Sequence, residues 1–104
     1  TGVQTCASDL VMLDSLKKTG LNIYVSTIYT AVPFEDPIWR KYAPIAINKF
    51  NDVIIAEASA EAIPVLHLQE VCTDAEDFSS VSPIEPSNRG GQKIVNQIVK
   101  TIFE

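Results

Sequence analysis

The chain has 104 residues, of which 46% are hydrophobic and 20% are charged, so it has room for one small domain with a modest core and is not composed like a disordered protein. Thirteen acidic residues outnumber eight basic ones, giving a net charge of −5. The basic residues form no cluster along the sequence, which argues against a nucleic-acid partner, because binding to phosphates requires grouped Lys and Arg side chains.

No apolar run approaches the roughly 20 residues that cross a bilayer, and no signal peptide opens the sequence. We therefore expect a soluble protein with no membrane span, and among compartments we favour the cytoplasm. The two cysteines, Cys6 and Cys72, show neither a redox nor a metal-binding spacing. They predict two small buried or half-buried side chains rather than a disulfide framework or a zinc site. No pattern in the sequence implies a cofactor.

The first predicted element is a helix over residues 7–19, in which leucines recur at helical spacing. Thr5 or Ser8 could cap its start, and Gly20 suits the left-handed position just past its end. Residues 22–30 are then rich in β-branched and aromatic side chains, which predicts a strand.

Pro33 and Pro37 indicate a loop after this strand. The next helix is predicted from about Pro44 to Ala62, because proline suits a first helical turn, where its missing N–H costs nothing. The apolar run from Ile63 to Val71 predicts a second strand.

A polar, acidic loop is predicted over residues 72–86, and its length is typical of functional loops. The last helix, predicted from Ser87 to Phe103, has the clearest apolar face in the chain. Because strands that alternate with helices pair in parallel, we expect an α/β fold. Its predicted architecture has three layers, α/β/α, with two parallel strands and three helices.

Two parallel strands form a poor sheet by themselves, because parallel sheets occur as wider layers that are covered on both faces. An unpaired strand edge is also ready to bind another strand. We therefore expect another protein chain, or a second copy of this one, to complete the sheet at the free edge of the first strand, where Ile28 lies.

The segment Ser82-Pro-Ile-Glu-Pro-Ser-Asn-Arg-Gly-Gly-Gln-Lys-Ile94 resembles the last block of SGNH (GDSL-type) hydrolases. That block reads Asp-x-x-His-Pro-Ser, then a Gly, then Lys-Ile-Ala at the start of the last helix. Residues 24–29, 48–55 and 63–66 are similar to the family's fourth strand, the following helix and the fifth strand. The resemblance implies a flavodoxin-like fold and hydrolysis of acyl esters, as in esterases and lipases. Residues 1–104 are accordingly a single α/β domain or the C-terminal segment of a larger one.

Ser82 and Glu85 occupy the positions of the family's catalytic Asp and His, so the resemblance implies that they are candidate catalytic residues. The family's Gly-Asp-Ser-Leu nucleophile block is absent, and so are its oxyanion Gly and Asn. Ester hydrolysis by a serine needs a nucleophile, a base and oxyanion donors. We therefore expect this chain to be inactive by itself and to need a partner that corresponds to the N-terminal hydrolase half.

Other interpretations stay open at this point. The chain could be a catalytically dead SGNH-like module that serves in binding or assembly. Glu85 could cap the last helix or fix the loop before it, and Ser82 could be a turn residue.

Phe34, Trp39 and Tyr42 follow the first strand, at the strand end that lines ligand crevices in α/β proteins. They are candidate substrate-binding residues, with helix packing as the alternative. His67 is the only histidine; it would lie within the second strand, and we interpret it as structural. The acidic residues at 74, 76 and 77 lack the spacing of a calcium loop and predict a solvated loop, so no metal site is expected.

Overall fold

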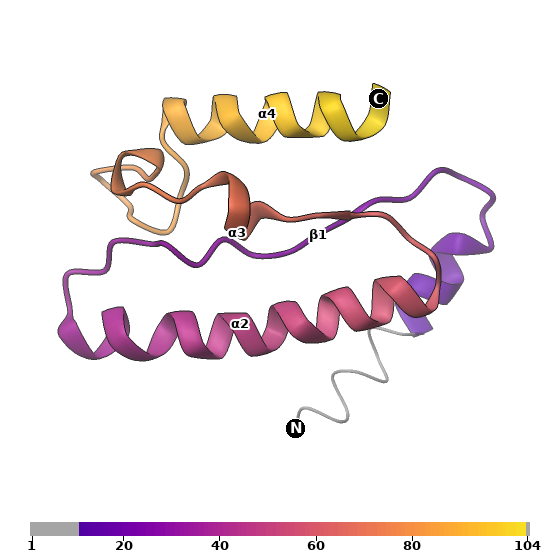
Figure 1. Ribbon diagram of the computed structural model, residues 1–104, viewed down its shortest axis with the longest axis horizontal. Coiled ribbons are helices and arrows are strands. Elements are labelled where there is room, and N and C mark those ends of the chain that lie inside the picture. Colours follow the sequence, from indigo (N-terminus) through magenta and orange to yellow (C-terminus); the bar gives the residue numbers. More distant parts are fainter. Residues whose placement is uncertain (1–10, 104) are drawn as a thin grey trace.

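The computed structural model describes residues 11–103 (Figure 1). Residues 11–17 are helical and form the first element. The elements that follow, in chain order, are β1 (Val25–Ser26), α2 (Pro37–Ala60), β2 (Val65–Leu66), α3 (Leu68–Val71), the 3-10 helix η1 (Ala75–Asp77) and α4 (Asn88–Phe103).

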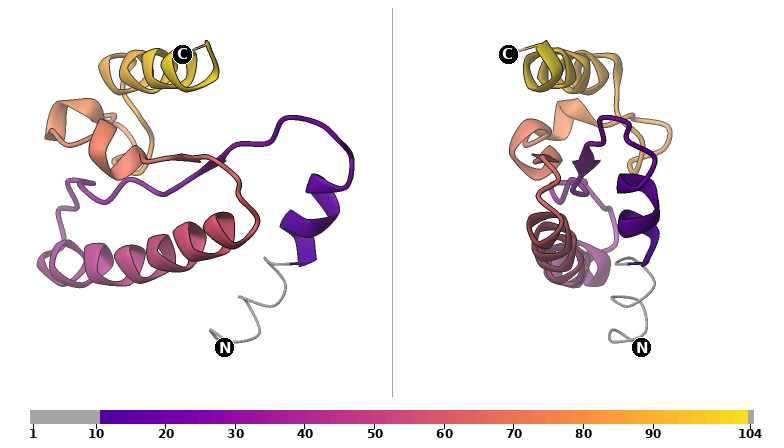
Figure 2. Two further views of the ribbon diagram at one scale, coloured as in Figure 1. Left: turned by 45° about the vertical axis from the view of Figure 1, so that its right-hand side comes forward. Right: turned by 90° about the vertical axis from the view of Figure 1, so that its right-hand side faces the viewer.

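The two strands pair in parallel, with Val25 opposite Val65 and Ser26 opposite Leu66. The long helices α2 and α4 lie on opposite sides of the extended segments that contain these strands, in both orientations of the molecule (Figures 1 and 2). The pairing covers only two residues of each strand, so most of the chain between the two helices is loop or short helix.

The predicted three-layer α/β/α fold, with its flavodoxin-like sheet, is wrong. Helices account for 58% of the structure and strands for 6%, and the described residues hold a two-stranded parallel sheet and four helices. The strand pair between α2 and α4 covers only two residues of each strand, and α4 packs against η1 and α3 as well as against β2.

Both strands end early because a side-chain hydroxyl replaces the main-chain carbonyl that would accept the next hydrogen bond of the ladder. The amide of Thr27 donates to the Leu66 carbonyl at 2.9 Å, which is the last backbone bond between the two segments. The next amide, from Leu68, donates instead to the Thr27 hydroxyl oxygen at 3.0 Å, and this hydroxyl donates to Gln69 Oε1. The chain then turns into α3, so the strand predicted up to Val71 ends at Leu66.

Asn51, in the middle of α2, binds the main chain of Ile28. This residue follows β1, and the bonds lie on the edge of the strand that faces away from β2. Asn51 Oδ1 accepts from the Ile28 amide and Asn51 Nδ2 donates to the Ile28 carbonyl, both at 2.8 Å. A buried side-chain amide, 2% exposed, therefore satisfies the two main-chain groups that a neighbouring strand would otherwise bind. The free edge that we expected at Ile28 is closed at that residue.

The second helix begins at Pro37, well before the predicted start at Pro44. Asp36 caps it, because its Oδ1 accepts from the Ile38 amide at 2.8 Å, and Pro37 occupies the first turn. An Asp-Pro pair is a strong start signal, and it prevails here although Pro44 then lies inside the helix, where it removes one helical hydrogen bond.

The ends of the chain agree with the sequence where the structure describes them. Gly20 has a φ of 78°, which is the left-handed conformation expected after the first helix. The predicted cap at Thr5 or Ser8, the start of that helix at 7–10 and Cys6 lie outside the described residues. The last helix is confirmed, and the Ser87 hydroxyl caps it by accepting from the Gly90 amide at 3.2 Å.

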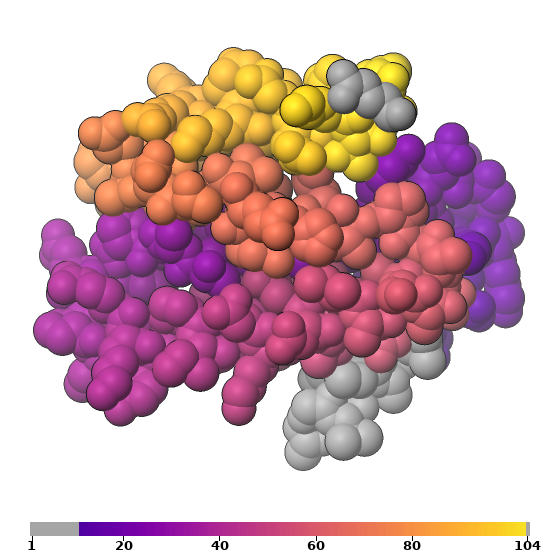
Figure 3. Space-filling view, viewed as in Figure 1, coloured from indigo at the N-terminus to yellow at the C-terminus, as the bar shows by residue number. Residues whose placement is uncertain are grey.

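The core is small, and many large apolar side chains lie outside it. The buried apolar residues form two separate clusters. One consists of Leu13, Ala58 and Ile63, and the other of Val32, Cys72 and Phe78. Most of the apolar stripe of α4 remains exposed, with Val95, Val99 and Phe103 at 52%, 49% and 79%. In Figure 3, α4 and α2 form the upper and lower borders of the molecule, with the connecting chain between them.

Candidate functional site

The two candidate catalytic residues occupy the ends of one β-turn. The Glu85 amide donates to the Ser82 carbonyl at 2.9 Å, and the Ser79 amide donates to the Glu85 carbonyl at 2.8 Å. Pro83 follows Ser82 in the second turn position, where its fixed φ is favourable. Ser82 is half-buried and Glu85 is exposed. The turn residues 82–85 hold the two side chains on one short loop, and in the described residues no hydrogen bond joins them.

Tyr29 attaches this turn to the chain that follows β1. Its hydroxyl donates to the Ile84 carbonyl at 2.6 Å, and its ring meets the ring of Phe78 edge-on, with centroids 5.2 Å apart. Burial raises the pKa of Tyr29, and the nearby Cys72 and Glu85 raise it further. Tyr29 was not predicted from the sequence, because an aromatic residue near a strand end gives no specific signal of its own.

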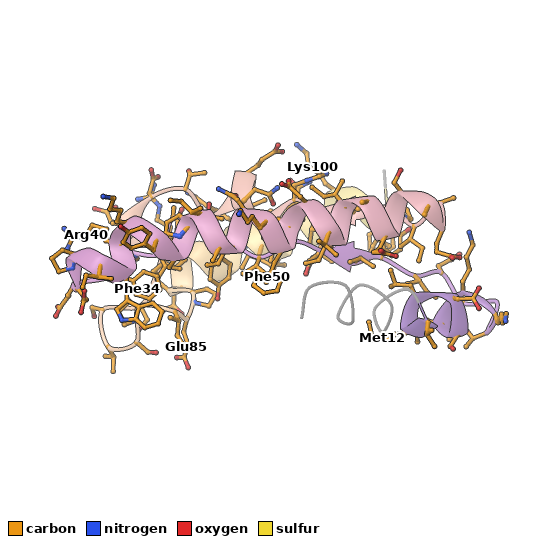
Figure 4. The ribbon with its side chains drawn as sticks, turned by 90° about the horizontal axis from the view of Figure 1, so that it is seen from below. Met12, Phe34, Arg40, Phe50, Glu85 and Lys100 are labelled. Atoms are coloured by element: carbon orange, nitrogen blue, oxygen red, sulfur yellow. The ribbon has the colours of Figure 1, made fainter. Side chains whose placement is uncertain are left out.

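An apolar groove lies beside the turn, with a volume of about 500 Å³. Its lining residues are Phe34, Trp39, Ala43, Ala46, Ile47 and Ile84. Four of them come from one face of α2, and Ile84 comes from the middle of the turn at residues 82–85. The apolar groove therefore adjoins the candidate catalytic residues. In Figure 4, Phe34 and Glu85 lie on the same side of α2, near its amino-terminal half.

Two of the three predicted aromatic residues line this groove. The rings of Phe34 and Trp39 lie with their centroids 6.3 Å apart. Tyr42 is not part of the lining; it is 56% exposed, and the Lys41 ammonium lies 5.3 Å from its ring centroid. Ala43 and Ala46 were missed, although two small residues between Trp39 and Ile47 on one helix face are a readable sign of a hollow.

The acidic residues of the long loop form ion pairs with α4 instead of a cation site. Arg89 pairs with Asp74 at 3.1 Å and with Glu76 at 2.5 Å, and Lys93 pairs with Asp77 at 2.8 Å. The expectation of a solvated loop is wrong for Asp77, whose side chain is fully buried. In residues 11–103 no group of His, Cys, Asp and Glu side chains is arranged to hold a metal ion.

Charge and hydrogen bonding fix the state of this buried carboxylate. The hydrogen bond from the Lys93 ammonium lowers the pKa of Asp77 against the opposing effect of burial, and the same contact raises the pKa of Lys93. The amides of Thr73 and Asp74 also donate to Asp77 Oδ2, at 3.1 and 3.0 Å. These contacts tie η1 to α4 through Asp77 Oδ2, whereas the buried Oδ1 has no hydrogen-bond partner among the described residues.

His67 and Cys72 have structural surroundings. His67 comes directly after β2, where it precedes α3, so it does not lie within the strand as predicted. Its Nδ1 is 3.5 Å from Nε2 of Gln69, and Gln69 in turn binds the Thr27 hydroxyl. Cys72 is a free, buried cysteine, and burial raises the pKa of its thiol.

Comparison with known proteins assigns no family. No family of known proteins matches the sequence, and no curated protein matches it. In the part of the chain that the structure describes, no helix combines the length and the apolar character that a membrane span needs.

Proposed function

We propose that this chain is the C-terminal segment of an SGNH-type ester hydrolase and that a partner polypeptide carries the serine nucleophile. The observation that carries the proposal is the attachment of the 82–85 turn to the chain after β1 by the Tyr29–Ile84 hydrogen bond of 2.6 Å. This bond holds the turn, with Glu85 in the position of the family's base, beside the chain that follows β1. Glu85 is exposed, so an ester can reach its carboxylate from solvent.

The chemistry assigned to Glu85 is that of a general base. The serine hydroxyl of the partner attacks the ester carbonyl while Glu85 accepts its proton, and the proton then passes to the departing alkoxide. Water hydrolyses the acyl-serine by the same proton transfers, which regenerates the serine. Ser82 closes the turn that positions Glu85. The partner also supplies the donors that stabilise the oxyanion.

Two features of the surface support a partner chain. Hydrogen-bonding groups alternate along a strand, so Val25 and Thr27 face β2, whereas Tyr24 and Ser26 face the opposite edge. In residues 11–103 no hydrogen bond outside the β1–β2 pair reaches the main-chain groups of Tyr24 or Ser26. The exposed apolar residues of α4 also form a continuous stripe along the helix. Continuous apolar surfaces of this kind mark interaction sites, whereas single exposed apolar residues do not.

The test is an activity-based label applied to the native protein. We expect its native mass to exceed the 11.4 kDa of this chain, and a fluorophosphonate probe to label a serine of the co-migrating polypeptide but none of this chain. The variant Ser26→Pro removes an N–H that β2 does not use, so it should release the labelled partner, whereas Ser26→Thr should retain it. Turnover of an ester by this chain alone, abolished by Glu85→Ala, would contradict the proposal, as would a native protein without a labelled serine.

A second function is favoured by the same exposed stripe. A catalytically dead module that serves in assembly would use α4 and the open edge of β1 without Glu85. In that case Ser26→Pro would still disrupt the complex, but no serine of the complex would react with the probe.

A further inference from the structure

A second hollow, separate from the apolar groove, lies beside the open edge of β1. It holds about 250 Å³. Its lining residues are Met12, Leu13, Val25, Ile54 and Glu57. Ile54 lies one turn of α2 after Asn51, on the same face of the helix, and Asn51 binds Ile28 on the edge that faces away from β2. Among the described residues, none of β2 lines the hollow. The hollow therefore opens beside the outer edge of β1.

The side chains of a strand added at this edge would point alternately toward α2 and toward α4. Val25 packs against the buried cluster that includes Ala58 of α2. Tyr24, on the other face of the strand, lines a crevice with Ile102 of α4. Opposite residues on neighbouring strands point to the same face of a sheet. The added residue opposite Val25 therefore points into the hollow.

The size and the apolar walls of the hollow restrict this residue. Four of the five lining side chains are apolar, so a polar group there would lose its hydration without gaining a partner. The volume of about 250 Å³ exceeds the roughly 150 Å³ of an apolar cavity that admits benzene. A large apolar side chain, such as that of leucine or phenylalanine, therefore fits.

Glu57 gives the hollow one charged wall. It is half-buried, and within residues 11–103 its carboxylate pairs with no Lys or Arg side chain. A carboxylate that is partly withdrawn from water gains most from a cationic partner. Glu57 lies almost one turn beyond Ile54 along α2, so its partner on the added strand belongs to the same strand face as the apolar residue. Residues on one face of a strand are two positions apart.

We propose that the edge of β1 binds an extended segment of the partner polypeptide, which places a large apolar side chain in the hollow and, two residues away, a lysine or arginine beside Glu57. This assignment rests on the proposed function for the existence of a partner, and it specifies the chemistry of the segment that the partner contributes. Asn51 limits the segment at the other end, because it already binds both main-chain groups of Ile28.

The test uses Met12, the only methionine of the sequence, which lines the hollow and is 54% exposed. The native complex is prepared with photo-methionine, so the diazirine of this chain lies at Met12 alone. Irradiation joins it to the occupant of the hollow, and mass spectrometry identifies the crosslinked peptide. We expect a peptide of the co-migrating polypeptide, crosslinked at a large apolar residue that is two positions from a lysine or arginine.

Charge reversal tests the contact with Glu57. Glu57→Lys brings like charges together, so the yield of the crosslink should fall at least tenfold. Asp52→Lys, an exposed change on α2 with the same effect on net charge, should leave the yield unchanged. Replacing the partner's cation with glutamate should weaken crosslinking to the unaltered chain tenfold and restore it to the Glu57→Lys variant. The first of these two results needs no variant of this chain, so misfolding of Glu57→Lys would leave the test intact.

Three results would overturn the proposal. They are a Met12 crosslink that stays within this chain or joins a second copy of it, a crosslink to a polar or acidic residue, and equal yields for Glu57→Lys and Asp52→Lys. The crosslink does not require a reactive serine. A partner that crosslinks as expected but has no serine that the fluorophosphonate labels would refute only the proposed hydrolase, and a labelled partner that Met12 does not reach would refute only this assignment.

Discussion

At the scale of single residues, Ala62 adopts an unfavourable backbone conformation to end α2. Its φ is 55°, and the amides of Ala62 and Ile63 donate to the carbonyls of Ser59 and Ala58 at 3.1 and 2.8 Å. This is the pair of bonds that closes a Schellman motif, in which glycine is the usual residue at the left-handed position. The motif directs Ile63 into the core, where it is 6% exposed.

Replacing Ala62 with glycine should relieve this strain. A left-handed conformation costs an L-residue roughly 1–2 kcal/mol, so we expect Ala62→Gly to raise the free energy of unfolding by about 1 kcal/mol, or Tm by roughly 4–8 °C. Chemical and thermal denaturation measure the change. The matched control, Ala56→Gly in the middle of α2, should lower stability by about 1 kcal/mol. A fall in stability for Ala62→Gly would contradict the geometry of the helix end.

The buried carboxylate of Asp77 should determine part of the acid sensitivity. Its pKa in the folded chain is lowered by Lys93, below the value of about 4 of an unfolded Asp. Its stabilisation is therefore complete above about pH 4 and is lost as the pH falls through the folded-state pKa. We expect Asp77→Asn to flatten the dependence of unfolding free energy on pH below about 4, whereas Asp52→Asn, an exposed change in α2, should keep the original slope. Equal slopes for both variants would refute this.

At the scale of elements, α4 approaches η1 closely because residue 90 has no side chain. Gly90 is buried, and a Cβ there would lie 2.9 Å from the carbonyl carbon of Asp77 and closer still to its oxygen. The same carbonyl accepts from the Ser87 amide at 2.9 Å, so it cannot move without loss of that bond. This contact could not be predicted from the sequence, since the resemblance matches the two glycines to a helix start without saying which one is crowded.

The two adjacent glycines should therefore respond in opposite directions to alanine. We expect Gly90→Ala to destabilise the protein by roughly 1–3 kcal/mol, the usual effect of overpacking. A Cβ at Gly91 would meet nothing within 4 Å, so Gly91→Ala should stabilise α4 by roughly 0.5–1 kcal/mol. Denaturation of both variants under the same conditions measures the difference. Equal effects would mean that α4 does not pack on η1 in this way.

At the scale of the whole molecule, local signals predicted elements better than they predicted the fold class. The apolar stripe located α4, and the β-branched segments located a parallel pair. The extent of the strands depends on Thr27 and Asn51, whose side chains replace strand partners through contacts distant in sequence, and no periodicity reports such contacts. The second helix begins at Pro37, in the segment predicted to be a loop, because Asp36 caps it there, whereas the sequence predicted its start at Pro44.

For the candidate site, too, the local sequence predicted some residues, whereas contacts distant in sequence could not be predicted. Phe34 and Trp39 were predicted from their position after a strand, and they line the apolar groove. Tyr42 is close in sequence but lies outside the groove lining, because its place in the helix differs from that of Trp39. Ile84 could not be predicted as a site residue, because only folding brings the turn at residues 82–85 next to α2.

The amide of Asn51 has a consequence for how tightly any added strand could bind. With Ile28 occupied, an incoming strand that pairs along residues 24–27 finds the main-chain groups of Tyr24 and Ser26, which offer four hydrogen bonds. At roughly 0.5–1.5 kcal/mol each, these supply about 2–6 kcal/mol, less than the roughly 8 kcal/mol of a micromolar complex. Backbone pairing would thus set the alignment of the partner, and its affinity would have to come from apolar side chains such as those exposed along α4.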